Sequence, residues 1–193
     1  MELVEGIATV EDLDAFVARL GAIGEEHGVT VQAFDAELVV DHAHLDRAVE
    51  LADRAVERGE NVARQRSVEI LLYAAGTRQI DSALKIGVSE GECPTVVLVD
   101  AVADDGSGEG NDAERCAAAA VRDIESGSTL DPTETLGACD PERVQAYFDV
   151  GAAELDAVNG TLADVVRERV ALLELERSTT RSVPLSRSLL HVE

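Results

Sequence analysis

The sequence predicts one layered α+β domain, in which a small mixed β-sheet of three to five strands packs with about six or seven helices. Of its 193 residues, 46% are hydrophobic, which is enough for the core of a single domain. Residues 29–34 and 95–101 are rich in β-branched residues, as strands are. Apolar residues recur at helical spacing elsewhere in the chain. Residues 178–193 lack a helical period, and we expect them to form a flexible tail.

The first elements are a strand at residues 3–8 and a helix at 10–23. Thr9 and Asp12 are three residues apart, so they can form a capping box before this helix. The expected apolar stripe of the helix consists of Leu13, Phe16, Val17 and Leu20. This stripe would place the helix against the sheet.

The next elements are the strand at 29–34, an ambiguous stretch at 36–40 that is read as a turn of helix, and a longer helix. Asp41 is expected to cap that helix, and Gly59 to end it. The apolar residues that repeat at helical spacing along it are Leu45, Ala48, Val49, Ala52, Ala55 and Val56.

Two short helices are expected within residues 59–86, the stretch around which the chain is organised. Ser67 is expected to cap the first and Thr77 the second, with Gly76 in the left-handed position between them. The first helix is apolar on all sides, so it must be covered by its own domain or by another protein.

The second half is expected to hold a central strand at 95–101 and an Ala-rich helix at 113–125. A loop at 126–139 leads to a helix at 141–149, which begins with a favoured proline. A final helix follows a capping box formed by Thr161 and Asp164. The spacing of acidic residues at 104–112 does not fit a calcium loop.

The net charge is −23, from 39 acidic and 16 basic residues, and Lys85 is the one lysine. Dense carboxylates with few lysines indicate adaptation to high salt. Such a surface is expected to repel DNA and anionic membranes. Residues 42–86, however, contain seven basic and seven acidic residues, so this window is neutral and can tolerate a polyanion.

No pattern makes a positive case for an enzyme, a metal site or a cofactor. The three cysteines are widely spaced, and the chain has no nucleotide-binding glycine motif and no nucleophile elbow. No apolar run is long enough to span a bilayer, and the N-terminus has no signal-peptide pattern, so we expect a cytoplasmic protein. The alternatives left open are a small halophilic enzyme or a ligand-binding regulatory domain that uses Cys93 or a pair of carboxylates.

Four cations of the 59–86 stretch are candidates for binding an anion or RNA. Arg64 and Arg66 lie before the apolar helix, and Arg78 is read as lying in the first turn of the next, where the helix dipole disfavours a cation. Lys85 completes the set. The other arginines of this region are expected to form solvated ion pairs.

The run EILLYAAGTRQI, at residues 69–80, resembles a segment of the smallest accessory subunit of the KEOPS (EKC) complex, the TPRKB family. Asn61-Val62-Ala63-Arg64 before it, VVLVDA in the strand and ERVALLELE near the C-terminus are also similar to that family. The resemblance covers residues 1–177 in order, so these residues are expected to form the family's single domain.

The resemblance implies an archaeal, non-catalytic subunit in the synthesis of threonylcarbamoyladenosine on tRNA. Such a subunit binds the complex's small kinase and helps to recruit tRNA through its 3′ CCA end. Carried over to this chain, the kinase would contact Ile70, Tyr73, Ile80 and Leu84. RNA would contact Arg64, Arg66, Arg78 and Lys85.

Overall fold

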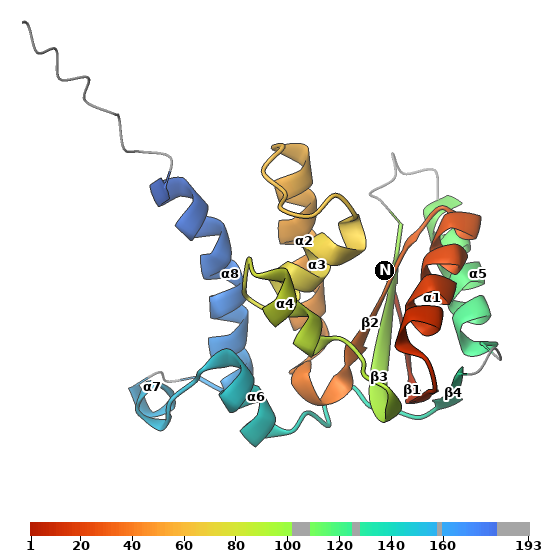
Figure 1. Ribbon diagram of the computed structural model, residues 1–193. Coiled ribbons are helices and arrows are strands. Elements are labelled where there is room, and N and C mark those ends of the chain that lie inside the picture. The colour runs from red at the N-terminus through yellow and green to blue at the C-terminus, as the bar shows by residue number, and fades with distance from the viewer. Residues whose placement is uncertain (102–108, 125–127, 158–159, 181–193) are drawn as a thin grey trace, which may run out of the picture.

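The computed structural model describes residues 1–101, 109–124, 128–157 and 160–180, and its centre is a four-stranded sheet in the order β2-β3-β1-β4 (Figure 1). The strands are β1 (Glu2–Val10), β2 (Thr30–Asp35), β3 (Gly91–Asp100) and β4 (Ser128–Pro132). The α+β class and the size of the sheet are confirmed. All the described ladders are antiparallel, so the sheet is not mixed as expected.

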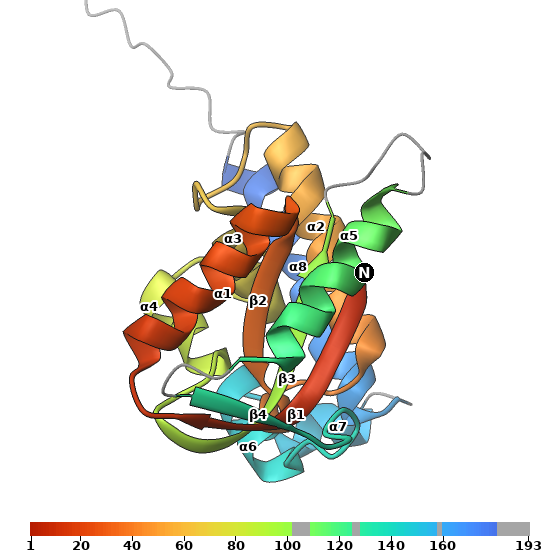
Figure 2. The same cartoon turned by 90° about the vertical axis from the view of Figure 1, so that its right-hand side faces the viewer.

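Helices cover both faces of the sheet (Figures 1 and 2). On one face lie α1 (Leu13–His27) and α5 (Glu109–Arg122). On the other lie α2 (His42–Glu57), α3 (Arg66–Ala74), α4 (Ile80–Ala83), α6 (Pro141–Phe148), α7 (Ala152–Ala157), α8 (Leu162–Thr180) and the 3-10 turns η1 (Ala36–Leu38) and η2 (Leu84–Ile86). Eight α-helices therefore occur in the described ranges, slightly more than expected.

Strand β3 is central and buried on both faces. Val96 and Leu98 enter the core beneath α2 and α3, whereas Val97 and Val99 enter the core beneath α1 and α5. All four side chains are 0% exposed. Because successive strand residues point to opposite faces, one apolar run supplies both cores.

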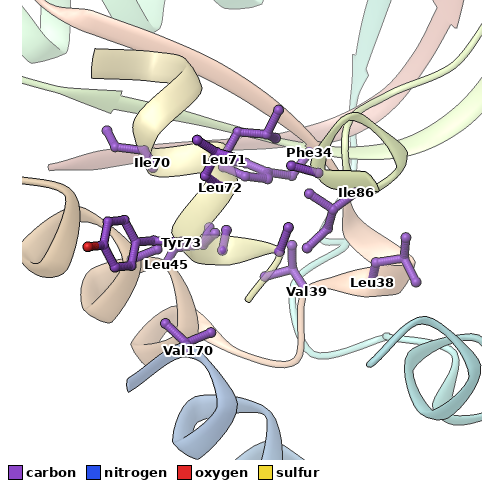
Figure 3. Close-up of a cluster of buried hydrophobic side chains, with 14 of the residues drawn as sticks. Phe34, Leu38, Val39, Leu45, Ile70, Leu71, Leu72, Tyr73, Ile86 and Val170 are labelled. Atoms are coloured by element: carbon purple, nitrogen blue, oxygen red, sulfur yellow. The ribbon is translucent and has the colours of Figure 1, made fainter. Parts of the chain in front are cut away.

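Helix α3 lies inside the larger core (Figure 3). Four successive side chains, Ile70, Leu71, Leu72 and Tyr73, are each 2% exposed or less. Helices α2 and α8 and strand β2 all contact α3. The helix that is apolar on all sides is therefore covered by its own domain.

The start of α3 differs from the prediction. The helix begins at Arg66, so Ser67 lies inside it and is not its cap. Instead, the buried carboxylate of Glu69 accepts hydrogen bonds from the backbone amides of Val62 (2.9 Å) and Ala63 (2.8 Å). This acid holds the loop before α3 against the helix, and a negative charge in the first turn also suits the helix dipole.

Three other features of the helix ends follow the prediction. The carboxylate of Asp41 accepts a hydrogen bond from the His44 amide at 2.8 Å, which caps α2. Thr161 and Asp164 exchange backbone-to-side-chain hydrogen bonds of 2.8 and 3.3 Å, so the capping box of α8 is confirmed. Gly76 has φ +60°, the left-handed conformation expected after α3.

Some local predictions are wrong. Asp12 alone caps α1, by accepting from the Ala15 amide at 2.9 Å, and Thr9 remains in β1. Val17, expected in the apolar stripe, is 54% exposed. The stretch 126–139, expected to be a loop, contains β4, whose five residues alternate too briefly to be recognised as a strand. Most of the acidic stretch at 104–112 and the end of the tail, 181–193, lie outside the described residues.

His44 is completely buried at the start of α2. Its Nε2 lies 2.8 Å from the carbonyl oxygen of Ala74, and its Nδ1 has no hydrogen-bond partner among the described residues. Burial lowers the pKa of His44, while the Ala74 contact and the charge of Asp41 act in the opposite direction and Arg167 adds to the lowering. The folded protein therefore holds this ring in its neutral form.

We expect the free energy of unfolding to fall as the pH drops below 6.5, the ordinary pKa of histidine, because the unfolded chain then binds a proton that buried His44 excludes. The contribution of neutral His44 to the free energy of unfolding is complete above pH 6.5. Below that pH it falls by about 1.4 kcal/mol per pH unit, until the pH reaches the lowered pKa of His44 in the folded protein. Urea unfolding between about pH 7.5 and 5.5, in high-potassium buffer, measures this. His44→Gln keeps a donor for Ala74 without titrating, so its profile should be flatter; parallel profiles would contradict the assignment.

Candidate functional site

The short helices α4 and η2 present apolar side chains to solvent. Ile80 is 44% and Leu84 56% exposed, whereas Ala83 and Ile86 are fully buried. The buried pair anchors the segment in the core, and the exposed pair faces outward. We call Ile80, Leu84 and the neighbouring exposed Lys85 the α4 surface. Two of the four residues predicted to contact a partner thus lie where a partner can reach them.

The other two, Ile70 and Tyr73, lie in the core at 0% and 1% exposure. The prediction that they face a partner is therefore corrected. The physical reason is that α2 and α8 already cover α3. An apolar run alone does not distinguish burial within a domain from burial against another protein.

Arg66 stabilises the fold. Its guanidinium lies 2.6 Å from the carboxylate of Asp53 in α2 and 2.5 Å from that of Asp100 at the end of β3. Its side chain is 13% exposed. Because both carboxylates already neutralise this cation, it is not available to RNA phosphates, and we do not retain the prediction that Arg66 binds RNA.

The remaining predicted cations are more accessible. Arg64 is exposed in the loop before α3 and has no ion-pair partner among the described residues. Arg78 is half-buried and donates a hydrogen bond to the Leu173 carbonyl at 3.2 Å, which ties the segment before α4 to α8. The sequence analysis placed Arg78 in the first turn of a helix, where it would oppose the helix dipole. This prediction is wrong, because α4 begins at Ile80 and Arg78 precedes it.

A pocket of about 520 Å³, here called the α4–α6 pocket, opens beside the α4 surface. It lies where the ends of α3 and α6 meet α4, η2 and α8. Its lining residues are Ala75, Gly76, Thr77, Ser82, Lys85, Ala146, Tyr147, Phe148, Asp149 and Arg169. Lys85 is therefore shared by the pocket and the α4 surface.

Aromatic rings form part of the pocket wall. Tyr147 and Phe148 pack edge to face with their centroids 4.9 Å apart. The Tyr147 hydroxyl donates to the Ser82 carbonyl at 3.0 Å, and burial raises the pKa of Tyr147 to about 12, so the phenol stays neutral. This bond holds α6 against α4.

Arg169 brings a second cation to the pocket from α8. It donates to the Asp149 carbonyl at 3.0 Å and to the Glu154 carboxylate at 2.9 Å. With Lys85, it gives the pocket cationic groups beside aromatic rings, which is the chemistry that binds phosphates and stacks bases. The sequence analysis missed Arg169 and Tyr147. The rarity of tyrosine in this chain, with two residues, was a signal that could have drawn attention to Tyr147.

Cys93 does not have the environment of a reactive thiol. It is 6% exposed, and burial together with the charge of Asp35 raises its pKa. A higher pKa leaves less of the nucleophilic thiolate at neutral pH. Within the described ranges, no group of three or more His, Cys, Asp or Glu side chains is placed to hold a metal ion. No helix in that part of the chain is both long and apolar enough to cross a membrane.

The model of the family described as "Kinase binding protein CGI-121" matches residues 9–174, which include the α4 surface, the α4–α6 pocket and strands β2, β3 and β4. No curated protein matches the chain.

The burial of Cys93 is testable by thiol labelling. We expect iodoacetamide to modify exposed Cys116 first, half-buried Cys139 more slowly and Cys93 slowest, because burial raises the pKa of both Cys93 and Cys139. Mass spectrometry of peptides from the native protein at a series of times gives the three rates, and urea-unfolded protein is the control in which they should converge. Rapid labelling of native Cys93 would restore the case for a thiol enzyme.

Proposed function

The chain belongs to the CGI-121 family of kinase-binding proteins, and from this premise we propose that it is a non-catalytic subunit of the cytoplasmic KEOPS complex of a salt-adapted archaeon. It binds the small kinase of that complex through the α4 surface, and the complex adds threonylcarbamoyladenosine to tRNA. The observation that carries the proposal is the outward display of Ile80 and Leu84 on a segment anchored by buried neighbours.

Exposed apolar side chains have a physical reason to bind a partner. Covering a large aliphatic side chain contributes about 1.5–3 kcal/mol, and a few such residues usually dominate the affinity of an interface. Electrostatics also favours an apolar contact here. A chain with net charge −23 in high salt gains little from screened surface ion pairs, whereas burial of apolar area is not screened.

Replacing Leu84 with Asp should weaken kinase binding at least about tenfold, because a charge would then be buried at the interface. Ile80→Asp should act in the same direction. Leu172→Asp is the control, since Leu172 is a similarly exposed apolar residue at 46% that lies on α8. Isothermal titration calorimetry with the cognate kinase in high-potassium buffer gives the dissociation constants. Unchanged affinity of both α4 variants for the kinase would exclude the α4 surface as the kinase-binding site.

A second role is favoured by the α4–α6 pocket. We propose that it receives the 3′ CCA end of tRNA, with Lys85 near a phosphate and Tyr147 beside a base. The exposed Arg64 and the half-buried Arg78 remain candidates for contacts with RNA outside the pocket. Because counterion release weakens as salt rises, stacking and hydrogen bonds must supply most of the affinity.

Removing the terminal CCA from tRNA should lower its affinity for the protein, and Lys85→Ala should lower the affinity for intact tRNA about three- to tenfold. Arg122→Ala is the matched control, because Arg122 is an exposed cation on α5, across the sheet from the pocket. Filter binding in high-potassium buffer compares both RNAs with each variant. Equal affinity for intact and shortened tRNA would eliminate the role in binding the 3′ end.

A further inference from the structure

An apolar groove of about 510 Å³ runs along the outer edge of the sheet. Figure 2 shows the elements that form it, with α1 in front of strand β2 and the α3–α4 segment behind. Its lining residues are Leu13, Val17, Ala18, Leu20, Gly21, Ala22, Glu25, Val31, Gln32, Ala33, Gln65, Ser67, Val68, Leu71, Leu84, Gly87 and Val88.

The floor of the groove is an open strand edge. Strand β2 is the last strand on its side of the sheet, so one side of its backbone has no ladder partner among the described residues. Open edges normally carry charged side chains or prolines that prevent pairing, yet Val31, Gln32 and Ala33 here are neither. The Gln32 side chain donates to the Ala33 carbonyl at 2.9 Å, a bond that the main-chain amide of an added strand would replace.

The walls leave room above the strand. On α1, the lining residues Ala18, Gly21 and Ala22 are small, and a Cβ atom added to Gly21 would meet no atom within 4 Å. On the rims, Val17 is 54% and Leu84 56% exposed, the two largest values among the exposed large apolar residues of the described ranges. The two most exposed large aliphatic side chains of the described residues thus line one groove.

The chemistry of the groove limits what can occupy it. Glu25 is the one charged residue among its lining residues, although the chain as a whole carries −23. The occupant must therefore be largely apolar. A second copy of the chain would bring another 23 negative charges against the first, which opposes self-association through this face. A lipid would fill the apolar space but would leave the hydrogen-bonding groups of β2 unused, whereas an extended polypeptide satisfies both.

We propose that this groove binds an extended, apolar segment of the partner kinase, which pairs with β2 as a fifth strand. The inference rests on the kinase binding proposed above and locates a second part of the same interface. Leu84 belongs to both the groove and the α4 surface, so the two form one continuous contact area. Main-chain hydrogen bonds to β2 would supply affinity, and the two apolar walls would select the side chains.

The test compares two valine substitutions in the complete protein. Val17→Asp places a carboxylate on the groove rim, and we expect it to weaken binding of the cognate kinase at least about tenfold. Val56→Asp is the matched control, because Val56 is also an exposed helical valine, at 45%, and does not line the groove. Its affinity should stay within about twofold of the original. Thermal unfolding should show both variants to be folded, since both side chains are already exposed.

Hydrogen exchange on the unsubstituted protein gives an independent result. With the kinase bound, backbone amides of β2 and of the α1 residues that line the groove should exchange more slowly, as expected when a strand is added. Unchanged exchange in these segments, or unchanged affinity of Val17→Asp for the kinase, would overturn the proposal that the groove binds the kinase. This holds even if Leu84→Asp weakens binding, in which case the proposed kinase binding itself stands. Protection of the groove that rises with protein concentration in the absence of kinase would identify a second copy as the occupant and would also overturn the proposal. If the original protein does not bind the kinase, the proposed function itself fails.

Discussion

The burial of residues 69–74 of α3 is the constraint on which the surrounding structure depends. Four successive large side chains leave water together, so the helix needs cover on every side, and α2, α8 and β2 provide it. The buried carboxylate of Glu69 holds the preceding loop, and Gly76 turns the chain sharply at the other end. Because α3 is fixed at both ends, the α4 segment is held at a defined place on the surface.

The same packing explains why the candidate binding features are neighbours. The segment that follows α3 supplies Leu84 to the apolar groove and Lys85 to the α4–α6 pocket. One short stretch, anchored by Ala83 and Ile86, therefore presents an apolar side chain in one direction and a cation in another. The proposed kinase contact and the proposed RNA pocket thus lie side by side on one small protein, which suits the non-catalytic role proposed above.

Electrostatics divides the arginines into two groups. Arg66 is enclosed by two carboxylates and joins α2, α3 and β3, and Arg169 is tied to α6–α7 while it lines a pocket. Arg64, by contrast, is exposed without an ion-pair partner among the described residues. Among the described residues, eight arginines form ion pairs with acidic side chains, several of them between different elements. Cations left accessible are the stronger candidates for contact with an anionic partner.

The sequence by itself determined the α+β class, the central strand and several helix ends, because periodicity, capping residues and Gly76 act locally. The sequence analysis missed β4 and α7, which are too short to show a period. It also wrongly predicted a mixed sheet, because the direction of each strand depends on pairing between distant parts of the chain. The site divided in the same way. The sequence marked the segment from Ile70 to Leu84, but only the tertiary structure separated buried Ile70 and Tyr73 from exposed Ile80 and Leu84. It alone brought Arg169 and Lys85 to one pocket, because side chains distant in the chain meet only when helices pack.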